Sequence, residues 1–519
     1  MMEGDSNSTD NEKDIKLSED RMSANERLSC EPMGANPMKD MEKGNPASEG
    51  ATLNITDPNI VDWDGPDDSQ NPRNWPKKNK IINVVLISAS VLYCNLATTM
   101  FSPGANIMEK EFGYDNSTIE ILTVTISSMG FAVGPMFIAP LSEVFGRVPI
   151  YRVASICYLG FTVGCARSTN VGEFLVFRLL TGLAASPFMT TGGGTIADIL
   201  EKEERGVAMA VFTAGPLLGP VLGPIVGGFV TQDLGWRWTF YLILILAGAV
   251  STLSLIFMRE TSSPVILKAK TARLRKETGN LNLRAAGDKQ IPIANLLGQA
   301  LKRPIKFLVL SPLILLTAIY LAFIFSIVML FYSTFPGVYE DTYHWSVGIS
   351  GLAYIGIGVG CTIAVFTFGK FSDRLVQDKS NEGKYRAERR MILVMYFCPL
   401  VPIGLFIYGW TAYYQVHWIA PIIGTAITGM GVLMITSSCQ IYIIDLFGPQ
   451  AAASALSAIT LLRNLLGACF PLAASALYDN LGLGWGNSVL AFIAVGFIAV
   501  PFLFYWRGQW LREKFPVEA

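Results

Sequence analysis

The chain has 519 residues, of which 51% are apolar and 16% charged, and its formal net charge is -1. Soluble domains carry about 25% charged residues, so much of this surface faces something other than water. The balanced charge argues against nucleic-acid binding, which needs a strongly basic face. Seven of the eight cysteines lie in or beside apolar runs, and the two histidines have no metal-binding spacing. We therefore expect no disulfide framework, metal site or cofactor.

Residues 1–75 are rich in Ser, Asn, Asp, Glu and Lys. Such a segment buries too little apolar surface to offset its ordering entropy, so we predict a disordered tail. It contains no charged stretch followed by an apolar run, which argues against a cleavable signal peptide. We expect the tail to remain in the cytosol and the first span to direct insertion.

Apolar stretches long enough to cross about 30 Å of hydrocarbon follow the tail. Many of these windows are apolar on every side, which argues against buried helices of a soluble protein. The sequence therefore predicts an all-α polytopic membrane protein. The twelve predicted spans are 81–101, 118–140, 149–166, 172–197, 206–231, 237–257, 306–332, 348–369, 390–409, 418–444, 452–476 and 485–506.

Lysine and arginine are concentrated in one set of the connections between spans, which predicts that this set and both termini are cytosolic. The predicted parts are therefore a tail (1–75), a six-helix bundle (76–257), a cytosolic linker (258–305), a second bundle (306–506) and a C-terminal tail (507–519). Within the linker, residues 267–280 fit either a basic amphipathic helix on the inner leaflet or a solvated connector.

An internal repeat supports two halves. The second and eighth spans end in similar segments that contain Glu143 and Asp373, and the fourth and tenth spans end near Asp198 and Asp445. Halves related by a pseudo-twofold axis along the membrane normal place a substrate site between them, near the midplane.

The fifth predicted span contains the run AGPLLGPVLGPIVGG, in which glycine recurs every four residues at 215, 219, 223 and 227. This spacing forms a ridge along which a neighbouring helix approaches closely. Prolines 216, 220 and 224 each remove a backbone donor, and in lipid such breaks need neighbours or a cavity to satisfy the carbonyls. The run predicts a closely packed, bent gate helix.

The segment GPVLGPIVGG resembles the GxxxGPxxGG antiporter motif of the major facilitator superfamily, and PLSEVFGR, WRWTFY and LLRNLLGACFPLAASALYDNLGLGW resemble its fungal twelve-span drug:proton antiporters. The resemblance covers roughly residues 60–515. It implies the major facilitator fold, with two six-helix bundles in pseudo-twofold symmetry, and alternating access without an enzymatic step. It assigns the antiporter motif to Gly219, Gly223, Pro224, Gly227 and Gly228.

The loop after the second span resembles the superfamily's GxxxDRxGRR signature, with Ala139, Glu143, Val144 and Val148 as departures. Gly146 and Arg147 match it. We expect a charge-linked cytosolic latch that holds one state and breaks in the other. The residues predicted for this cytosolic gate are Glu143, Gly146, Arg147, Asp198, Asp373, Arg374 and Asp445.

Two residues are candidates for proton coupling. Arg178 matches the arginine of the superfamily's RxxxG motif, which the resemblance links to coupling, and an arginine within a span is costly enough to mark function. The alternative for Arg178 is snorkelling toward the outer interface. Glu120 is the best-placed titratable acid near the outer end of the second span, and its alternative is an ionised interfacial carboxylate.

Aromatic and polar side chains in the second half suggest a poorly polar cavity for amphipathic or planar ligands, although packing explains any one of them. Arg463 lies deep in the eleventh span and would suit an anion or an interbundle polar contact. The cavity candidates are Tyr320, Phe323, Tyr332, Tyr354, Gln440, Tyr442, Arg463 and Asn464.

These features predict a monomeric transporter that exports small hydrophobic or amphipathic molecules, such as drugs, toxins or secondary metabolites, by proton antiport. Its expected partners are the substrate, protons and the lipid bilayer, in the plasma membrane or the vacuolar membrane. The alternative is a facilitator, or an exporter of small carboxylates or polyamines. A non-transporting receptor, an ATP-driven pump and an enzyme all lack their sequence signatures.

Overall fold

The computed structural model describes residues 59–519 except 115, 202–203, 287–292, 377–386 and 516–519. The chain divides into two units, Met1–Thr56 and Asp57–Ala519, and the second unit is described here. Its described residues contain twelve helical segments long and apolar enough to cross a membrane. This unit is the predicted all-α polytopic membrane protein.

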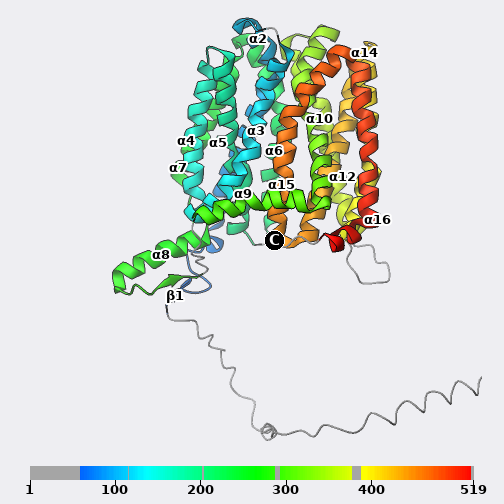
Figure 1. Cartoon of the computed structure of the whole chain (residues 1–519). Helices are drawn as coiled ribbons and strands as arrows, with labels where there is room; N and C mark the ends of the chain where they lie inside the picture. Colours follow the sequence, from blue (N-terminus) through cyan, green and yellow to red (C-terminus); the bar gives the residue numbers. More distant parts are fainter. Residues whose placement is uncertain (1–58, 115, 202–203, 287–292, 377–386, 516–519) are drawn as a thin grey trace, which may run out of the picture. The chain divides into compact units, whose positions relative to one another are not determined.

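The first half of the unit is built from six of these spans, which Figure 1 draws in blue to green. Its second, third, fourth, fifth and sixth spans are each a single helix, and the first span extends through a 3-10 turn into a short helix. Its elements are α1 (Lys77–Met100), η2 (Ser102–Gly104), α2 (Ala105–Phe112), α3 (Ser117–Phe145), α4 (Arg147–Arg167), α5 (Val171–Ile199), α6 (Arg205–Leu234) and α7 (Arg237–Phe257).

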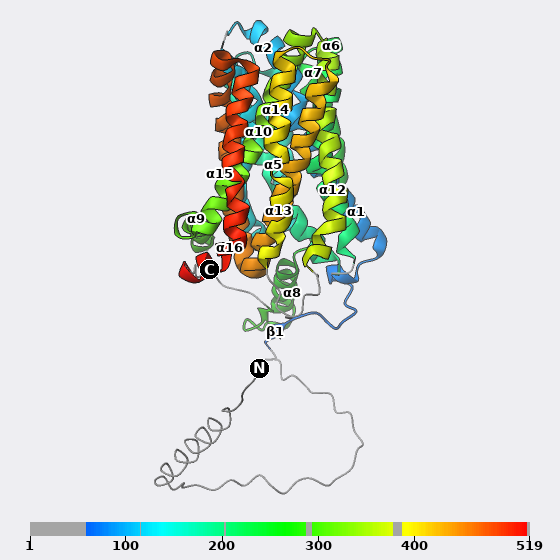
Figure 2. The ribbon, with the colours of Figure 1, turned by 90° about the vertical axis from the view of Figure 1, so that its right-hand side faces the viewer.

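The second half repeats the six-span arrangement (Figure 2). Its elements are α10 (Pro312–Tyr343), α11 (Val347–Ser350), η3 (Gly351–Tyr354), α12 (Ile355–Val376), η4 (Ala387–Arg389), α13 (Arg390–Phe397), α14 (Leu400–Tyr413), α15 (Ile419–Phe497) and α16 (Ala499–Lys514). The long element α15 contains two spans, Ile419–Phe447 and Ala452–Ala474, and most of a third, which α16 completes.

Each half has its own interior. One cluster of buried side chains draws only on residues from Phe307 to Phe504, whereas two others draw only on residues from Val84 to Met258. Large apolar side chains also remain exposed on the spans, for example Ile256 at 66% and Phe366 at 75%. Water would oppose such exposure and hydrocarbon does not, so these side chains are suited to contact with lipid.

Two helices separate the halves in sequence, α8 (Ser263–Thr278) and α9 (Ile293–Leu310). Helix α9 runs across the ends of the spans of both halves (Figure 1). We call this end of the unit the α9 face and the opposite end, where α2 lies, the α2 face. The seventh span begins at Pro312 rather than at residue 306, because Ser311 ends α9 and its side chain caps the new helix at Ile314.

The segment before the first span is ordered from residue 59 onward, in contrast to the predicted disorder of residues 1–75, of which 1–58 lie outside the described part. Strand β1 (Ile60–Val61) pairs in parallel with β2 (Arg284–Ala285). Nζ of Lys270 in α8 contacts Oδ1 of Asp64 at 2.6 Å and Oδ2 of Asp68 at 3.5 Å.

We call this assembly of residues 59–75, α8 and β2 the clasp. The carboxylates of Asp64 and Asp68 account for the ordered structure of residues 59–75, because they neutralise Lys270, whose side chain is only 5% exposed. Most of the basic segment 267–280 lies in helix α8 and so belongs to the clasp.

Candidate functional site

The glycine ridge of α6 packs along α1. A Cβ atom added at Gly219 would lie 2.6 Å from Cβ of Asn95, and one added at Gly223 would lie 2.5 Å from Oγ1 of Thr99. Both distances are too short for any side chain, so only glycine permits this approach. The four-residue spacing thus positions α6 directly against α1.

One proline of α6 frees a backbone carbonyl that a residue of α1 then satisfies. Pro224 has no N–H to donate to the carbonyl of Pro220, and the Thr99 hydroxyl donates to that carbonyl instead, at 3.4 Å. A Cβ atom on Gly228 would lie 2.7 Å from the carbonyl oxygen of Val347, in the second half. The motif therefore faces α1 on one side and the second half on another.

The two halves are joined toward the α2 face. Ser102 of η2 donates a hydrogen bond to the carbonyl of Tyr332, and its hydroxyl lies 3.0 Å from that of Tyr354. The amide side chain of Gln232 in α6 accepts a hydrogen bond from the N–H of Gly348 at 2.9 Å. These contacts close this side of the interface, and Tyr332 and Tyr354 belong to that closure.

A groove of about 320 Å³ runs between α6 and α12, nearer the middle of the spans. Its lining is apolar apart from Thr362, and Leu218, Leu222 and Val359 on its walls are each more than 40% exposed. The groove lies on the boundary between the halves, below the contacts of the α2 face.

Arg178 of α5 is 1% exposed, and each nitrogen of its guanidinium donates a hydrogen bond. Its guanidinium donates to the carbonyls of Ala97 and Thr98 in α1, at 3.1 and 3.0 Å, and to those of Thr123 and Val124 in α3, at 3.2 and 3.4 Å. Helix α1 ends at Met100, so the Ala97 and Thr98 carbonyls need donors from elsewhere. Arg178 joins three helices and does not snorkel.

Glu120 lies half-buried in the first turn of α3, close to the α2 face. The charges acting on its carboxylate come from Glu109 in α2 and from Glu340 and Asp341 at the end of α10. No ion pair of Glu120 is found within the described residues. Carboxylates of both halves thus act on Glu120 where the halves close, and Lys110 offsets part of this negative charge at Glu340.

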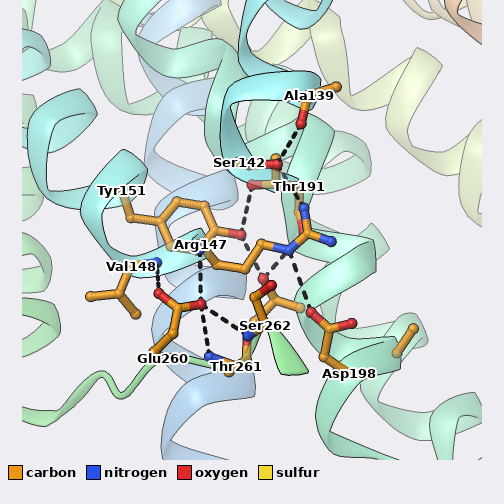
Figure 3. Close-up of polar contacts among 12 residues, drawn as sticks. Ala139, Ser142, Arg147, Val148, Tyr151, Thr191, Asp198, Glu260, Thr261 and Ser262 are labelled. Carbon is orange, nitrogen blue, oxygen red and sulfur yellow. Dashed lines mark hydrogen bonds and ion pairs between the residues drawn. The ribbon is translucent and has the colours of Figure 1, made fainter. Parts of the chain in front are cut away.

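At the α9 face of the first half, Nε of Arg147 lies 3.4 Å from Oδ2 of Asp198, and its Nη1 donates to the Ser142 hydroxyl at 2.7 Å (Figure 3). The Glu260 carboxylate accepts hydrogen bonds from the N–H groups of Arg147 and Val148, at 2.9 and 3.0 Å. Glu260 also accepts from the two residues that follow it. The carboxylate therefore caps the start of α4.

The second half contains a matching pair at the α9 face. Nε of Arg390, the first residue of α13, lies 3.1 Å from Oδ2 of Asp445 in α15. Glu143 is exposed and makes no ion pair with any described residue. Asp373 and Arg374 lie on α12, and their side chains fall outside the described part.

The predicted cavity residues separate into different surroundings. Tyr320 and Phe323 stack on Phe497, with ring centroids 5.3 and 5.0 Å apart, so both pack between α10 and α15. Tyr442 is fully buried against Phe504 of α16. The remaining three lie on α15, where Gln440 and Arg463 are half-buried and Asn464 is buried.

Sequence reasoning missed Glu260 and Arg390 as site residues. Glu260 follows the sixth span directly, and an acid that can reach a helix N-terminus is a recognised cap, but its target is more than a hundred residues away in sequence. Arg390 could have been predicted from the internal repeat, because its position relative to Asp445 corresponds to the position of Arg147 relative to Asp198.

Twelve apolar spans in two six-span halves, joined toward one face and carrying the buried Arg178, define a polytopic membrane transporter. Residues 85–470 match the family model described as Major Facilitator Superfamily, and the chain belongs to this superfamily. Among solved structures it resembles a D-xylose-proton symporter, with a TM-score of 0.62 and 17% identity over 82% of this chain and 97% of that one. The predicted fold is confirmed.

Curated relatives are fungal. The chain is 53% identical to MFS transporter prlG of Fungal sp. (strain NRRL 50135), over 88% of this chain and 97% of the relative. It is 47% identical to the Trichosetin biosynthesis cluster MFS transporter of Gibberella fujikuroi (strain CBS 195.34 / IMI 58289 / NRRL A-6831), over 89% and 90%. It is 44% identical to Efflux pump radE of Floropilus chiversii, over 88% and 85%. The predicted resemblance to fungal members of the superfamily is thus confirmed.

Proposed function

We propose that this transporter exports small hydrophobic or amphipathic organic molecules, including secondary metabolites, by proton antiport with alternating access. The names of two relatives, an efflux pump and a transporter of a biosynthesis cluster, support the direction and the cargo class. The apolar groove between α6 and α12 supports a poorly polar cargo.

The proposed proton coupling is supported by the concentration of acidic residues from both halves at the α2 face. Glu109 and Glu120 belong to the first half, and Glu340 and Asp341 to the second. Closing this face brings like charges together, and a proton bound by one of them reduces the repulsion. Proton binding therefore favours closure of the α2 face, and proton release favours its opening.

Arg178 acts in this proposal by holding α1, α3 and α5 as one body. The first turn of α3 carries Glu120, so movement of this body moves the carboxylate relative to the second half. The α9 face is cytosolic, because lysine and arginine are concentrated in the connections on that side. We assign the protein to the plasma membrane.

The test is efflux of labelled hydrophobic compounds from transporter-deficient cells, with and without a protonophore. We expect efflux to collapse without the proton gradient and to be lost in Glu120→Gln and Arg178→Lys. Glu173→Gln is the matched control, since it removes an exposed carboxylate at the same end of the first half. Efflux that persists without the gradient would establish a facilitator. Efflux of small carboxylates or polyamines alone would show that these compounds, and not hydrophobic molecules, are the cargo.

A further inference from the structure

Two of the arginines within spans, Arg178 and Arg463, have different surroundings. Arg178 donates to four backbone carbonyls. Arg463 lies in the middle of the span Ala452–Ala474, and its guanidinium makes no hydrogen bond or ion pair with any residue that the structure describes. Its Nε atom is buried without a partner. A cation at membrane depth is costly and ordinarily paired, so an unpaired one marks a place where a partner arrives from outside the protein.

An aromatic ring lies against one face of the Arg463 guanidinium. Its Cζ atom lies 5.0 Å from the ring centroid of Phe325 in α10. From Tyr320 to Ser333, Phe325 is the one residue that is not buried. A guanidinium over an aromatic ring keeps its N–H groups directed outward in its own plane, where they match the two oxygens of a carboxylate.

Glycine makes room for this arrangement. Gly467 lies one helical turn from Arg463, and a Cβ atom added there would lie 2.6 Å from the Phe325 ring. A side chain at position 467 would displace the ring from its place beneath the guanidinium. One face of α15 therefore carries both Arg463 and the glycine that leaves space for the Phe325 ring.

This pair lies where the first half meets the second. The Thr125 hydroxyl of α3 donates to the carbonyl of Ala468 at 3.1 Å, and the Ser128 hydroxyl lies 3.8 Å from Sδ of Met329. A Cβ atom on Gly467 would lie 3.5 Å from Cγ of Met329. In transporters built from two such halves, the substrate binds at this boundary near the midplane.

The chain supplies no anion at this depth on the two helices concerned. The span Ala452–Ala474 contains no Asp or Glu, and the acids of α10 are Glu340 and Asp341 at its α2-face end. We propose that Arg463 and Phe325 form a subsite for an anionic group of the cargo, a carboxylate joined to an apolar, partly planar body. This inference rests on the proposed export of organic molecules and names the chemical class of the cargo.

Binding to the purified full chain in lipid nanodiscs tests the subsite. The probes are 2-naphthoate, 2-anthroate and 1-pyrenebutyrate, each beside its neutral carboxamide, measured by probe fluorescence. We expect at least one acid to bind about tenfold to a hundredfold more tightly than its amide. Arg463→Gln removes this difference by weakening acid binding alone, and Arg463→Lys keeps part of it.

Phe325→Leu weakens the acid and the amide alike, because the ring contacts the body of the ligand. Arg237→Gln, at the α2 face, is the control for a general loss of positive charge and leaves the preference unchanged. Thermal unfolding of each variant identifies any that misfold, and Arg463→Lys keeps the test decisive if Arg463→Gln is among them.

Equal binding of acids and amides by the wild type would overturn the subsite, as would an equal loss of both in Arg463→Gln. If amides bind and are exported without any preference for acids, the inference fails and the export function stands. If no probe binds and no organic compound is exported, both fail together.

Discussion

The two ion pairs at the α9 face are related by the internal repeat. They differ in the additional contacts made by the helix that carries the arginine. In each half an arginine at the start of one span meets an aspartate at the end of the next, Arg147 with Asp198 and Arg390 with Asp445. Helix α4 starts directly at Arg147, and Glu260 binds its first N–H groups. Helix α13 starts after the 3-10 turn η4 rather than directly at the end of the preceding loop. The repeat preserves the pair, but the first half adds an attachment to the linker.

The largest expected effect comes from removing that attachment. Glu260→Ala leaves the N–H groups at the start of α4 without their acceptor, so we expect the free energy of unfolding to fall by about 2–3 kcal/mol. The measurement is SDS-induced unfolding of the purified protein. Glu388→Ala is the control in the second half, where the carboxylate lies 3.9 Å from Arg512. We expect that change to cost less than about 1 kcal/mol, and equal losses would remove the contrast between the halves.

Gly146→Ala tests the same cap from the backbone side. Gly146 has φ +97° and ψ 169°, and an added Cβ atom would lie 2.5 Å from Oε2 of Glu260. Gly235 has φ +91° and ψ 160° with open space around it. Both alanines carry backbone strain of about 1–3 kcal/mol, and only the first also displaces the carboxylate. We expect Gly146→Ala to unfold more readily than Gly235→Ala, and the reverse order would show that the cap tolerates displacement.

Double-mutant cycles compare the pairs themselves. We expect Arg147→Gln with Asp198→Asn, and Arg390→Gln with Asp445→Asn, each to show a coupling of about 0.5–1 kcal/mol in the free energy of unfolding. The second pair should couple slightly more strongly, because its atoms are closer and its side chains less exposed. A cycle without coupling would mean that the ion pair in that half contributes nothing measurable.

The smallest effect concerns the clasp, whose helix α8 follows Glu260 closely in the linker. The N–H groups of Asp64 and Gln70, with Lys270 nearby, hold the pKa of Asp68 below its usual range. A carboxyl with a lowered pKa stabilises the folded form above its ordinary pKa, and this contribution disappears as pH falls through the lowered value. We therefore expect the clasp to loosen below about pH 4.

Hydrogen exchange measures this loosening. The N–H groups of Arg284 and Ala286 donate to the carbonyls of Asn59 and Val61, so their protection reports the strand pair directly. Asp68→Asn should lower that protection near neutral pH, after correction for intrinsic exchange rates, while leaving unfolding of the spans unchanged. Unaltered protection in Asp68→Asn would show that the strands hold without the acid.

The number of spans and the glycine ridge could be predicted because each depends on local composition. Span length follows from hydrocarbon thickness, and the approach of α6 to α1 follows from glycines spaced by one turn. The boundary between α9 and the seventh span was harder to predict. The apolar end of α9 at residues 307–310 is followed at once by the apolar sequence from Pro312, so the sequence predicts one span for both. Only the cap at Ser311 separates the two helices.

The contrasts among the arginines could not be predicted. Arg178 and Arg463 are both arginines within apolar spans, and the difference lies in which carbonyls or rings the neighbouring helices bring to them. The same is true of the clasp, where Lys270 meets acids some two hundred residues earlier in the chain. Such partners depend on the packing of separate helices, which a single sequence does not encode locally.

The strand pair of the clasp also has a consequence for biosynthesis. Residues 60–61 leave the ribosome before any span has been made, and their partners at 284–285 follow only after all six spans of the first half. At ordinary rates of translation the first strand waits on the order of 10–45 s for its partner. Closure of the clasp therefore marks the moment at which the whole first half has been synthesised, before the second half begins.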